Sequence, residues 1–538
     1  MMRRTAANRA VALGLVVTIL IVLAIIDLGP QVSHAAPKTC ESLAQTALPN
    51  TKITAAQTIN AGEFTPPGRT ASVKELPGFC RVQATLTPST DSDIKMEVWL
   101  PLNGWNGKYR GQGNGGYAGA IGFDAMAGAI KLGYATAGTD TGHKGSDASW
   151  ALGHPEKVID FGWRAIHEMT LQAKAIIQEF YGEAPKRSYF AACSNGGREA
   201  LMEAQRFPAD YDGIIAGAPA NYWTRLLTAG AIMHAITLKG DGYIPATKLP
   251  AINAAVLTAC DSKDGVTDGL LNDPRQCQFD PAVLICKGAD ADSCLTEAQA
   301  RALKNIYTGV RDGGNPYFPG YPVGSENSGW NAWITGPAPL RSTSFFFGSQ
   351  YFANMVYGKA DWDYRTFNFA EATKLAESKT AAALNAIDPN LAAFKGRGGK
   401  LIMYHGWNDP AIPALNTINY FESVMKRMGR RDTDSFLRLF MAPGLGHCGG
   451  GPGPNVFGQA GGVMADDPEH NIYRALEQWV EKGIAPDRLT AAKYKDDRNP
   501  GQGVKMTRPL CAYPKIAKYK SSGDSNDAAN FVCAPPGK

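Results

Sequence analysis

The sequence has none of the features that mark several large classes of protein. Charged residues make up 19% of the 538 residues, and the formal net charge is only +5. There is no block of Lys and Arg and no alternation of basic with aromatic residues, so a nucleic-acid partner is not indicated. No two cysteines have the spacing Cys-x-x-Cys, which argues against a zinc cluster or a thioredoxin-like redox site. Internal repeats and low-complexity tracts are also missing, so a repeat architecture is not expected.

One apolar run near the N-terminus could contact a membrane. Three arginines within the first nine residues precede the apolar run 11–26, and small residues follow up to Ala35. This order is typical of an export signal, so we predict that residues 1–35 are removed. The alternative is an uncleaved membrane anchor, but the run is shorter than the roughly 20 apolar residues that span a bilayer. We therefore expect a secreted or periplasmic protein without stable membrane association after cleavage.

All ten cysteines follow the predicted signal, and an even number in an exported protein indicates disulfides. Pairing each cysteine with its nearest neighbour gives four short-range bonds: Cys40–Cys80, Cys260–Cys277, Cys286–Cys294 and Cys511–Cys533. Cys193 and Cys448 are left for each other, although the count alone allows other pairings. Cys193 precedes Ser194, and Cys448 follows His447. A disulfide holds its Cα atoms about 4.4–6.8 Å apart, so this bond would bring a hydroxyl and an imidazole together across about 250 residues.

Strands and helices alternate on both sides of a long irregular segment. Short buried strands are expected at 188–192, 214–218, 400–404 and 436–441, and helices at 161–181, 198–206, 415–428 and 471–482. Residues from about 220 to 390 are instead rich in aromatics, Asn, Ser and Gly, and hold four of the cysteines. Alternating strands and helices predict a mostly parallel sheet. We predict an α/β fold of the α/β-hydrolase type, with a catalytic domain formed by 36–220 and 391–538 and an inserted lid domain at 221–390.

Ser194 lies between an expected buried strand and an expected helix. Small residues stand two positions before and after it, as in the nucleophile elbow of α/β hydrolases. The alternative is an ordinary serine that caps a helix. In an elbow the backbone N–H of Asn195 would face the oxyanion, at a helix N-terminus that favours negative charge. Gly115 and Gly116 follow an early strand and are candidates for the second oxyanion donor, or else form a plain turn.

An acid and a base follow the next two expected strands. Asp409 comes after the strand at 400–404, where it could orient an imidazole or could simply form a turn before a proline. His447 lies on a glycine-rich loop after the following strand, and the order Ser, Asp, His is that of α/β hydrolases. His405 is the second choice for the base.

The expected lid contains a separate signal. One segment of eight residues holds three carboxylates, Asp261, Asp264 and Asp268. Calcium takes six to eight oxygen ligands, including backbone carbonyls, which Val266 and Leu270 could supply. The expected disulfide across this segment would hold the loop closed. An acidic loop facing solvent is the alternative. We predict a structural Ca²⁺ in the lid.

Together these motifs resemble the tannase and feruloyl esterase family of secreted α/β hydrolases, over nearly all of the chain after residue 35. The hallmark of that family is a Cys-Ser-Asp-His-Cys arrangement in which a disulfide joins the residues next to Ser and His. It maps onto Cys193, Ser194, Asp409, His447 and Cys448. The family's lid carries a calcium site, which implies the five ligands named above. The resemblance implies a serine esterase that hydrolyses esters of feruloyl-type or galloyl-type aromatic acids through an acyl-enzyme.

One branch of the family cleaves half-esters such as mono(2-hydroxyethyl) terephthalate, and grips the free carboxylate with a lid arginine followed four residues later by an aromatic. Arg341 and Phe345 have this spacing, although Phe346 is apolar where the branch carries a hydroxyl. Trp330, Trp333 and the two phenylalanines could wall the acyl pocket or form a small core of the lid. The remaining alternatives are a serine peptidase or acyltransferase, and a non-catalytic phenolic or carbohydrate binder that has kept the fold.

Overall fold

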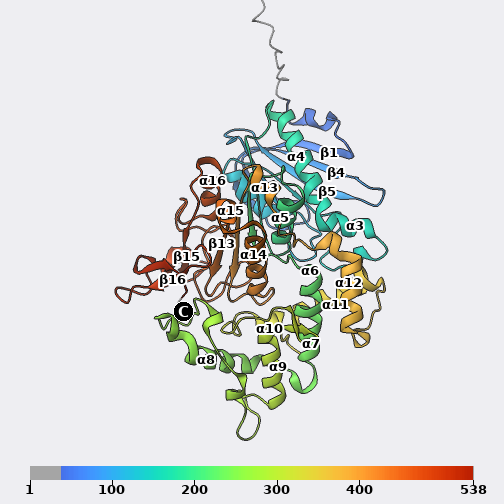
Figure 1. Cartoon of the computed structure of the whole chain (residues 1–538). Coiled ribbons are helices and arrows are strands. Elements are labelled where there is room, and N and C mark those ends of the chain that lie inside the picture. Colours follow the sequence, from blue (N-terminus) through green and yellow to red (C-terminus); the bar gives the residue numbers. More distant parts are fainter. Residues whose placement is uncertain (1–37, 537–538) are drawn as a thin grey trace, which may run out of the picture.

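The computed structural model describes residues 38–536, so the predicted signal at 1–35 lies outside the described residues. Within the described range, no helix is long and apolar enough to cross a membrane. A nine-stranded sheet runs through the centre of the molecule in the order β1-β4-β5-β7-β6-β8-β9-β12-β13 (Figure 1). Its strands are β1 (Thr51–Ile59), β4 (Phe79–Leu86), β5 (Ile94–Pro101), β6 (Lys108–Gln112), β7 (Ala135–Thr139), β8 (Arg187–Cys193), β9 (Gly213–Gly217), β12 (Lys400–Gly406) and β13 (Leu437–Ala442).

The sheet is parallel in one half and antiparallel in the other. From β7 through β6, β8, β9 and β12 to β13 all neighbours are parallel. The pairs β1–β4, β4–β5 and β5–β7 are antiparallel. The carboxyl ends of the parallel strands meet at one edge, which is where α/β folds place their sites. The predicted α/β architecture is therefore confirmed, with an antiparallel extension formed by residues before 140.

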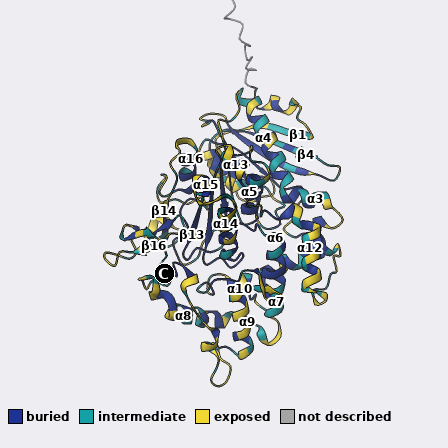
Figure 2. Cartoon of the chain, viewed as in Figure 1, coloured by how far each residue is buried: buried dark blue, intermediate teal, exposed yellow. Residues whose placement is uncertain are grey.

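Helices cover both faces of the sheet because successive side chains of each strand point to opposite faces. Phe190 of β8 and Leu401 of β12 share one cluster of buried apolar residues, while their neighbours Tyr189 and Ile402 belong to another. The first cluster is covered by α4 (Ala165–Tyr181), α5 (Asn195–Arg206) and α14 (Ala414–Met428), and the second by α2 (Phe123–Lys131) and α16 (Ile472–Lys482). Figure 2 shows the buried residues gathered along the central strands.

The chain between β9 and β12 adds no strand to the nine-stranded sheet. It forms helices that Figure 1 shows together on one side of the sheet. They are α6 (Trp223–Arg225), α7 (His234–Thr237), α8 (Leu249–Cys260), α9 (Glu297–Thr308), α10 (Trp330–Trp333), α11 (Thr343–Gln350) and α12 (Phe369–Leu384), with the hairpin β10 (Val310–Asp312) and β11 (Asn315–Phe318). The short helix α13 (Ala392–Gly396) also precedes β12 but lies apart from them (Figure 1), and its Phe394 joins the first buried cluster of the sheet. Trp330 is fully buried in a core formed by this insertion alone, so it packs the insertion and does not wall a pocket.

Short hairpins and bridges complete the fold. The hairpins are β2 (Gly62–Phe64) with β3 (Val73–Leu76), β14 (Arg488–Tyr494) with β15 (Val504–Cys511), and β16 (Ile516–Tyr519) with β17 (Phe531–Ala534). All ten cysteines are paired as predicted, with Cα atoms between 5.0 and 5.9 Å apart. The bond between Cys193 and Cys448 spans 255 residues and joins the end of β8 to the turn after β13.

Candidate active site

The end of β8 turns sharply into α5 at Ser194. The serine has φ 67° and ψ −123°, a conformation that side-chain-bearing residues rarely adopt. Such a turn needs small neighbours: a Cβ on Gly196 would lie 2.4 Å from the Cβ of Ala192, and one on Gly197 would lie 2.2 Å from the carbonyl oxygen of Gly217. The sequence therefore places the serine hydroxyl at the carboxyl edge of the sheet, as a nucleophile elbow does.

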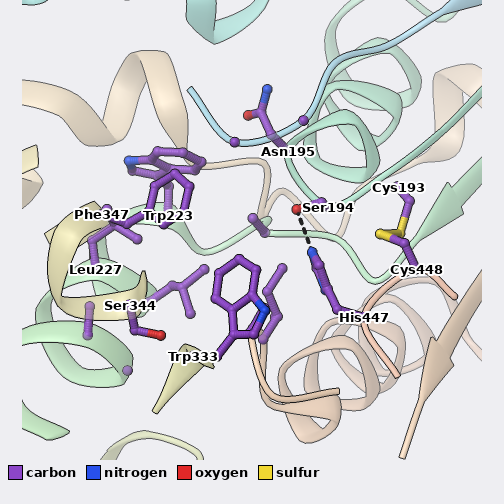
Figure 3. Close-up of a pocket in the computed structure, with 18 of the residues that line it drawn as sticks. Cys193, Ser194, Asn195, Trp223, Leu227, Trp333, Ser344, Phe347, His447 and Cys448 are labelled. Atoms are coloured by element: carbon purple, nitrogen blue, oxygen red, sulfur yellow. Dashed lines mark hydrogen bonds between the residues drawn. A yellow bond between two sulfur atoms is a disulfide. The ribbon is translucent and has the colours of Figure 1, made fainter. Parts of the chain in front are cut away.

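Three residues from three strand ends form one hydrogen-bonded chain. The Nε2 atom of His447 lies 2.9 Å from Oγ of Ser194 (Figure 3), and its Nδ1 atom lies 2.8 Å from Oδ2 of Asp409. The two contacts fit the neutral imidazole with its proton on Nδ1, which donates to the carboxylate while Nε2 accepts from the hydroxyl. The structure thus brings the three predicted residues together in the arrangement of a catalytic triad.

A disulfide lies beside this hydrogen-bonded chain and constrains the serine and the histidine. Cys193 and Cys448 have Cα atoms 5.9 Å apart, and each is covalently next to Ser194 or His447. Figure 3 shows the two bonded sulfur atoms to one side of the imidazole. His447 sits on a turn with no regular structure, so the bond fixes a residue that the sheet alone would leave on a free loop.

Asp409 is completely buried, and its charge is stabilised by two histidines. Burial favours the neutral acid, but electrostatic attraction to His447 and hydrogen bonds from His405 and His447 lower the pKa of Asp409 below its usual range. His405 lies 3.1 Å from Asp409 and 3.0 Å from the carbonyl oxygen of Ile412 through Nε2, and 2.7 Å from Oγ1 of Thr417 through Nδ1. Its ring contacts the aspartate and not the serine. His405 therefore orients the acid, and the structure does not support it as the base.

Asn195 begins α5, and its backbone N–H is one of the free amides at a helix N-terminus. Gly115 and Gly116 line the same cavity as Ser194, on the loop after β6. The structure thus brings all three predicted oxyanion residues to the nucleophile, and both glycines stay candidates for the second donor.

A buried carboxylate that sequence reasoning missed ties the two oxyanion segments together. One oxygen of Glu199 accepts the backbone N–H of Asn114 at 2.9 Å, and the other accepts Nδ2 of Asn195 at 2.9 Å. Arg198 donates to Oδ1 of the same asparagine at 2.7 and 2.9 Å. Burial raises the pKa of Glu199 to about 7. The only signal in the sequence is a run of charged residues on a helix that follows the nucleophile.

A cavity of about 430 Å³ opens beside the serine. Its lining consists of Asn114, Gly115, Gly116, Cys193, Ser194, Asn195, Ala220, Trp223, Leu226, Leu227, Gly230, Ala231, Trp333, Ser344, Phe347, Ala411, Ile412, His447 and Cys448. No Lys, Arg, Asp or Glu side chain is among these lining residues. Trp333 lies in the lining as predicted, with its ring 5.5 Å from that of His447 and stacked at 6.0 Å on Phe347.

Two predicted substrate residues, Arg341 and Phe345, do not line this cavity. Arg341 is exposed, and Phe345 packs edge-on against Tyr364 at 5.4 Å. The reason is the phase of α11, which Ser342 caps by accepting the N–H of Phe345. Residues three apart share a helix face, so Ser344 and Phe347 face the cavity instead. Phe346 is also exposed, and the aromatic wall comes from Phe347.

The acidic loop of the insertion follows α8 and is closed by the bond between Cys260 and Cys277. Asp261 accepts the backbone N–H groups of Asp268 and Gly269, and Asp264 accepts those of Val266 and Asn272. Burial, with repulsion from neighbouring carboxylates, raises the pKa of Asp264 to about 6. Asp268 is paired with the buried guanidinium of Arg508 in β15. Crowded, partly desolvated carboxylates with nearby carbonyls suit a hard divalent cation.

Comparisons with known proteins agree with this geometry. A family model described as "Tannase and feruloyl esterase" matches residues 80–534. The chain is 42% identical to an uncharacterized esterase of Xanthomonas campestris pv. campestris, over 93% of the chain and 92% of that protein. It is 34% identical to feruloyl esterase B of Aspergillus niger, over 86% of the chain and 88% of that protein. The crystal structure of an esterase from Aspergillus oryzae matches with a TM-score of 0.85 and 30% sequence identity. The match covers 92% of this chain and 99% of the Aspergillus oryzae chain.

Proposed function

The chain belongs to the tannase and feruloyl esterase family, and from this premise we propose that Ser194, His447 and Asp409 hydrolyse carboxylic esters of aromatic acids through an acyl-enzyme. It is a carboxylic ester hydrolase by this membership. The observation that carries the mechanism is the continuous chain of hydrogen bonds from the serine to the buried aspartate. Cavity and nucleophile adjoin, so an acyl group bound there has its carbonyl carbon within reach of the serine.

The reaction has two steps. Ser194 attacks the ester carbonyl while His447 accepts the hydroxyl proton, and Asp409 stabilises the imidazolium. Backbone N–H groups of Asn195 and of Gly115 or Gly116 stabilise the oxyanion. The C–O bond to the alcohol breaks, and the alcohol leaves with the proton held by His447. Water then gives a proton to the same imidazole and attacks the acyl-enzyme carbonyl. The bond from the acyl carbon to the Ser194 oxygen breaks, the imidazolium returns the proton to that oxygen, and the aromatic acid leaves.

The charge of the cavity favours an acyl group without a free carboxylate. None of its lining side chains carries a positive charge, and Arg341 is exposed outside it. A carboxylate buried there would lose hydration without gaining a counter-ion, at a cost of several kcal/mol. We therefore favour neutral feruloyl-type or galloyl-type esters over terephthalate half-esters.

A substrate panel tests this proposal directly. Wild type and Ser194→Ala are assayed on methyl ferulate, methyl gallate, chlorogenate, the terephthalate monoester and a feruloyl amide. We expect hydrolysis of the neutral aromatic esters, poor turnover of the monoester and the amide, and loss of activity by orders of magnitude in the variant. Preference for the amide would indicate a peptidase, and ester turnover by the variant would refute the nucleophile.

We also propose that the acidic loop binds a structural Ca²⁺. Three carboxylates (Asp261, Asp264 and Asp268) and the carbonyls of Val266 and Leu270 would hold the ion. In the structure the carboxylate oxygens of these three residues do not all lie within 4.8 Å of one another, so they would have to move closer together to hold the ion. Calcium content and melting temperature are measured before and after chelation. Chelation should lower the melting temperature and calcium should restore it, and Asp264→Asn should abolish both effects. A protein that melts alike with and without calcium would exclude the site.

Finally, we propose export with removal of residues 1–35. Support comes from the signal-like N-terminus and from five disulfides, which persist in oxidising compartments. N-terminal sequencing of protein exported from a bacterial host should begin at residue 36. An intact N-terminus in the membrane fraction would show an anchor instead.

A further inference from the structure

One hydroxyl in the cavity wall has no hydrogen-bond partner among the described residues. It belongs to Ser344 of α11, a residue that is only 8% exposed. The nearest group that could accept from it is the hydroxyl of Tyr321, which itself donates to the carbonyl oxygen of Ala411 at 3.2 Å. Leaving a buried hydroxyl unpaired costs about 1–3 kcal/mol, so such a group in a binding cavity points to a ligand that pairs with it.

Two other residues that line the cavity have a buried polar atom without a hydrogen-bond partner, but neither atom is placed to hydrogen-bond to a substituent on the acyl ring. Asn114 stands beside the oxyanion glycines, and its amide nitrogen already donates to the carbonyls of Ala120 and Thr139 at 2.9 Å. The indole nitrogen of Trp223 lies on the edge of its ring that faces away from Ser194 in Figure 3. The same figure shows the hydroxyl of Ser344 pointing from its helix toward Trp333, across the cavity from the nucleophile.

The surroundings of Ser344 make its hydroxyl selective. Most of the other side chains that line the cavity are apolar, among them Leu226, Leu227, Ala231, Trp333 and Phe347. An ester whose carbonyl sits at Ser194 can extend its acyl ring along this apolar wall. The stacked pair Trp333 and Phe347, with ring planes within 3° of parallel, offers flat faces for an aromatic ring. A polar substituent at the far end of that ring can then hydrogen-bond to the hydroxyl of Ser344.

We propose that Ser344 determines specificity by hydrogen bonding to a neutral polar substituent on the acyl ring, of which a phenolic hydroxyl is the type. This inference rests on the proposed esterase function and adds the part of the acyl group that is recognised. A serine hydroxyl both donates and accepts, and rotation about χ1 can turn it toward the substituent. A carboxylate does not fit, because no lining side chain neutralises it. The enzyme therefore selects hydroxylated aromatic acids over their unsubstituted counterparts.

The test compares matched esters on matched variants. Methyl 4-hydroxycinnamate, methyl 4-methoxycinnamate and methyl cinnamate differ only at the ring position in question. Ser344→Ala removes the hydroxyl, and Ser349→Ala is the control, because that serine lies on the same helix and donates to the carbonyl of Phe346 at 3.0 Å. The quantity measured is the ratio of kcat/KM for the hydroxylated ester to that for the unsubstituted ester, which cancels any effect common to all esters.

We expect wild type and Ser349→Ala to share one ratio above unity, and Ser344→Ala to lower it by about 2- to 10-fold, as one neutral hydrogen bond does. The methoxy ester should fall between the other two, since it accepts but does not donate. The melting temperature of Ser344→Ala should match or exceed that of wild type, because an unpaired buried hydroxyl is removed.

Each contrary outcome overturns a different statement. If Ser344→Ala leaves the ratio unchanged while wild type hydrolyses all three esters, the specificity role is wrong and the esterase function stands. If wild type hydrolyses none of the esters, the proposed function fails first. A lower melting temperature with an unchanged ratio would show that the hydroxyl serves the fold.

Discussion

The bond between Cys193 and Cys448 should matter to catalysis beyond its effect on stability. We consider the variant in which both are alanine, with removal of Cys511 and Cys533 as the control. The entropy of closing a loop of 255 residues corresponds to about 5 kcal/mol, against about 3 kcal/mol for the 22-residue loop of the control. Both variants therefore melt at lower temperature, and activity must be measured well below either transition.

The effect on the rate follows from the triad geometry. The hydroxyl of Ser194 and Nε2 of His447 are 2.9 Å apart, so a displacement of about 1 Å breaks the hydrogen bond. A misplacement of that size costs about 100-fold in rate. We expect kcat on methyl ferulate to fall by about two orders of magnitude in the active-site variant and by less than 3-fold in the control, with circular dichroism showing both folded. A folded active-site variant with wild-type kcat would refute the reasoning, as would equal losses in both.

Other perturbations separate the roles of individual residues. Asp409→Asn should lower kcat by about 10⁴-fold without unfolding the protein, because the wrong imidazole tautomer then faces the serine. A small loss of kcat would mean that another residue is the acid of the triad. Glu199→Gln should lower kcat with little change in KM, because the amide has one acceptor oxygen and can no longer accept from both oxyanion segments. A selective rise in KM would contradict this. The same variant should flatten the pH dependence of the melting temperature. Because the folded pKa of Glu199 is about 7 against an ordinary 4.5, the folded state keeps a proton that the unfolded chain has lost, so the stability it contributes is full below pH 4.5 and disappears as pH rises through 7. Wild type and variant with parallel pH profiles would contradict that. Arg341→Ala should leave kcat/KM on every ester within 2-fold of the wild-type value. A selective loss on the terephthalate monoester would show that the arginine binds the carboxylate of that substrate.

The parts of the site that the sequence predicts correctly are local. Ser194 stands in a strand-turn-helix segment with small neighbours, and β12 begins at Lys400, as predicted. The predicted partners Asp409 and His447 follow strand ends, and parallel strands bring such ends to one edge of the sheet. Four disulfides follow from an even number of cysteines and short separations, and the bond between Cys193 and Cys448 follows because these two cysteines are left over.

The parts that the sequence does not reveal depend on distant contacts or on helix phase. Glu199 acts on Asn114, which is 85 residues away, and no local pattern links them. The spacing of Arg341 and Phe345 suggests a binding pair, but the cap at Ser342 starts the helix in a phase that turns Ser344 to the cavity. The sequence also does not reveal that β1, β4 and β5 pair antiparallel, because the direction of pairing depends on contacts between strands and not on the local pattern of any one of them.

The central claim is that Ser194 is the nucleophile of an acyl-enzyme. The most direct measurement is the intact mass of the oxidised protein after treatment with a fluorophosphonate, followed by mapping of the modified peptide. One adduct per chain on Ser194, with none in Ser194→Ala and slow labelling in Asp409→Asn, is the result that the triad geometry predicts. An unmodified protein, or an adduct on any other residue, would contradict it.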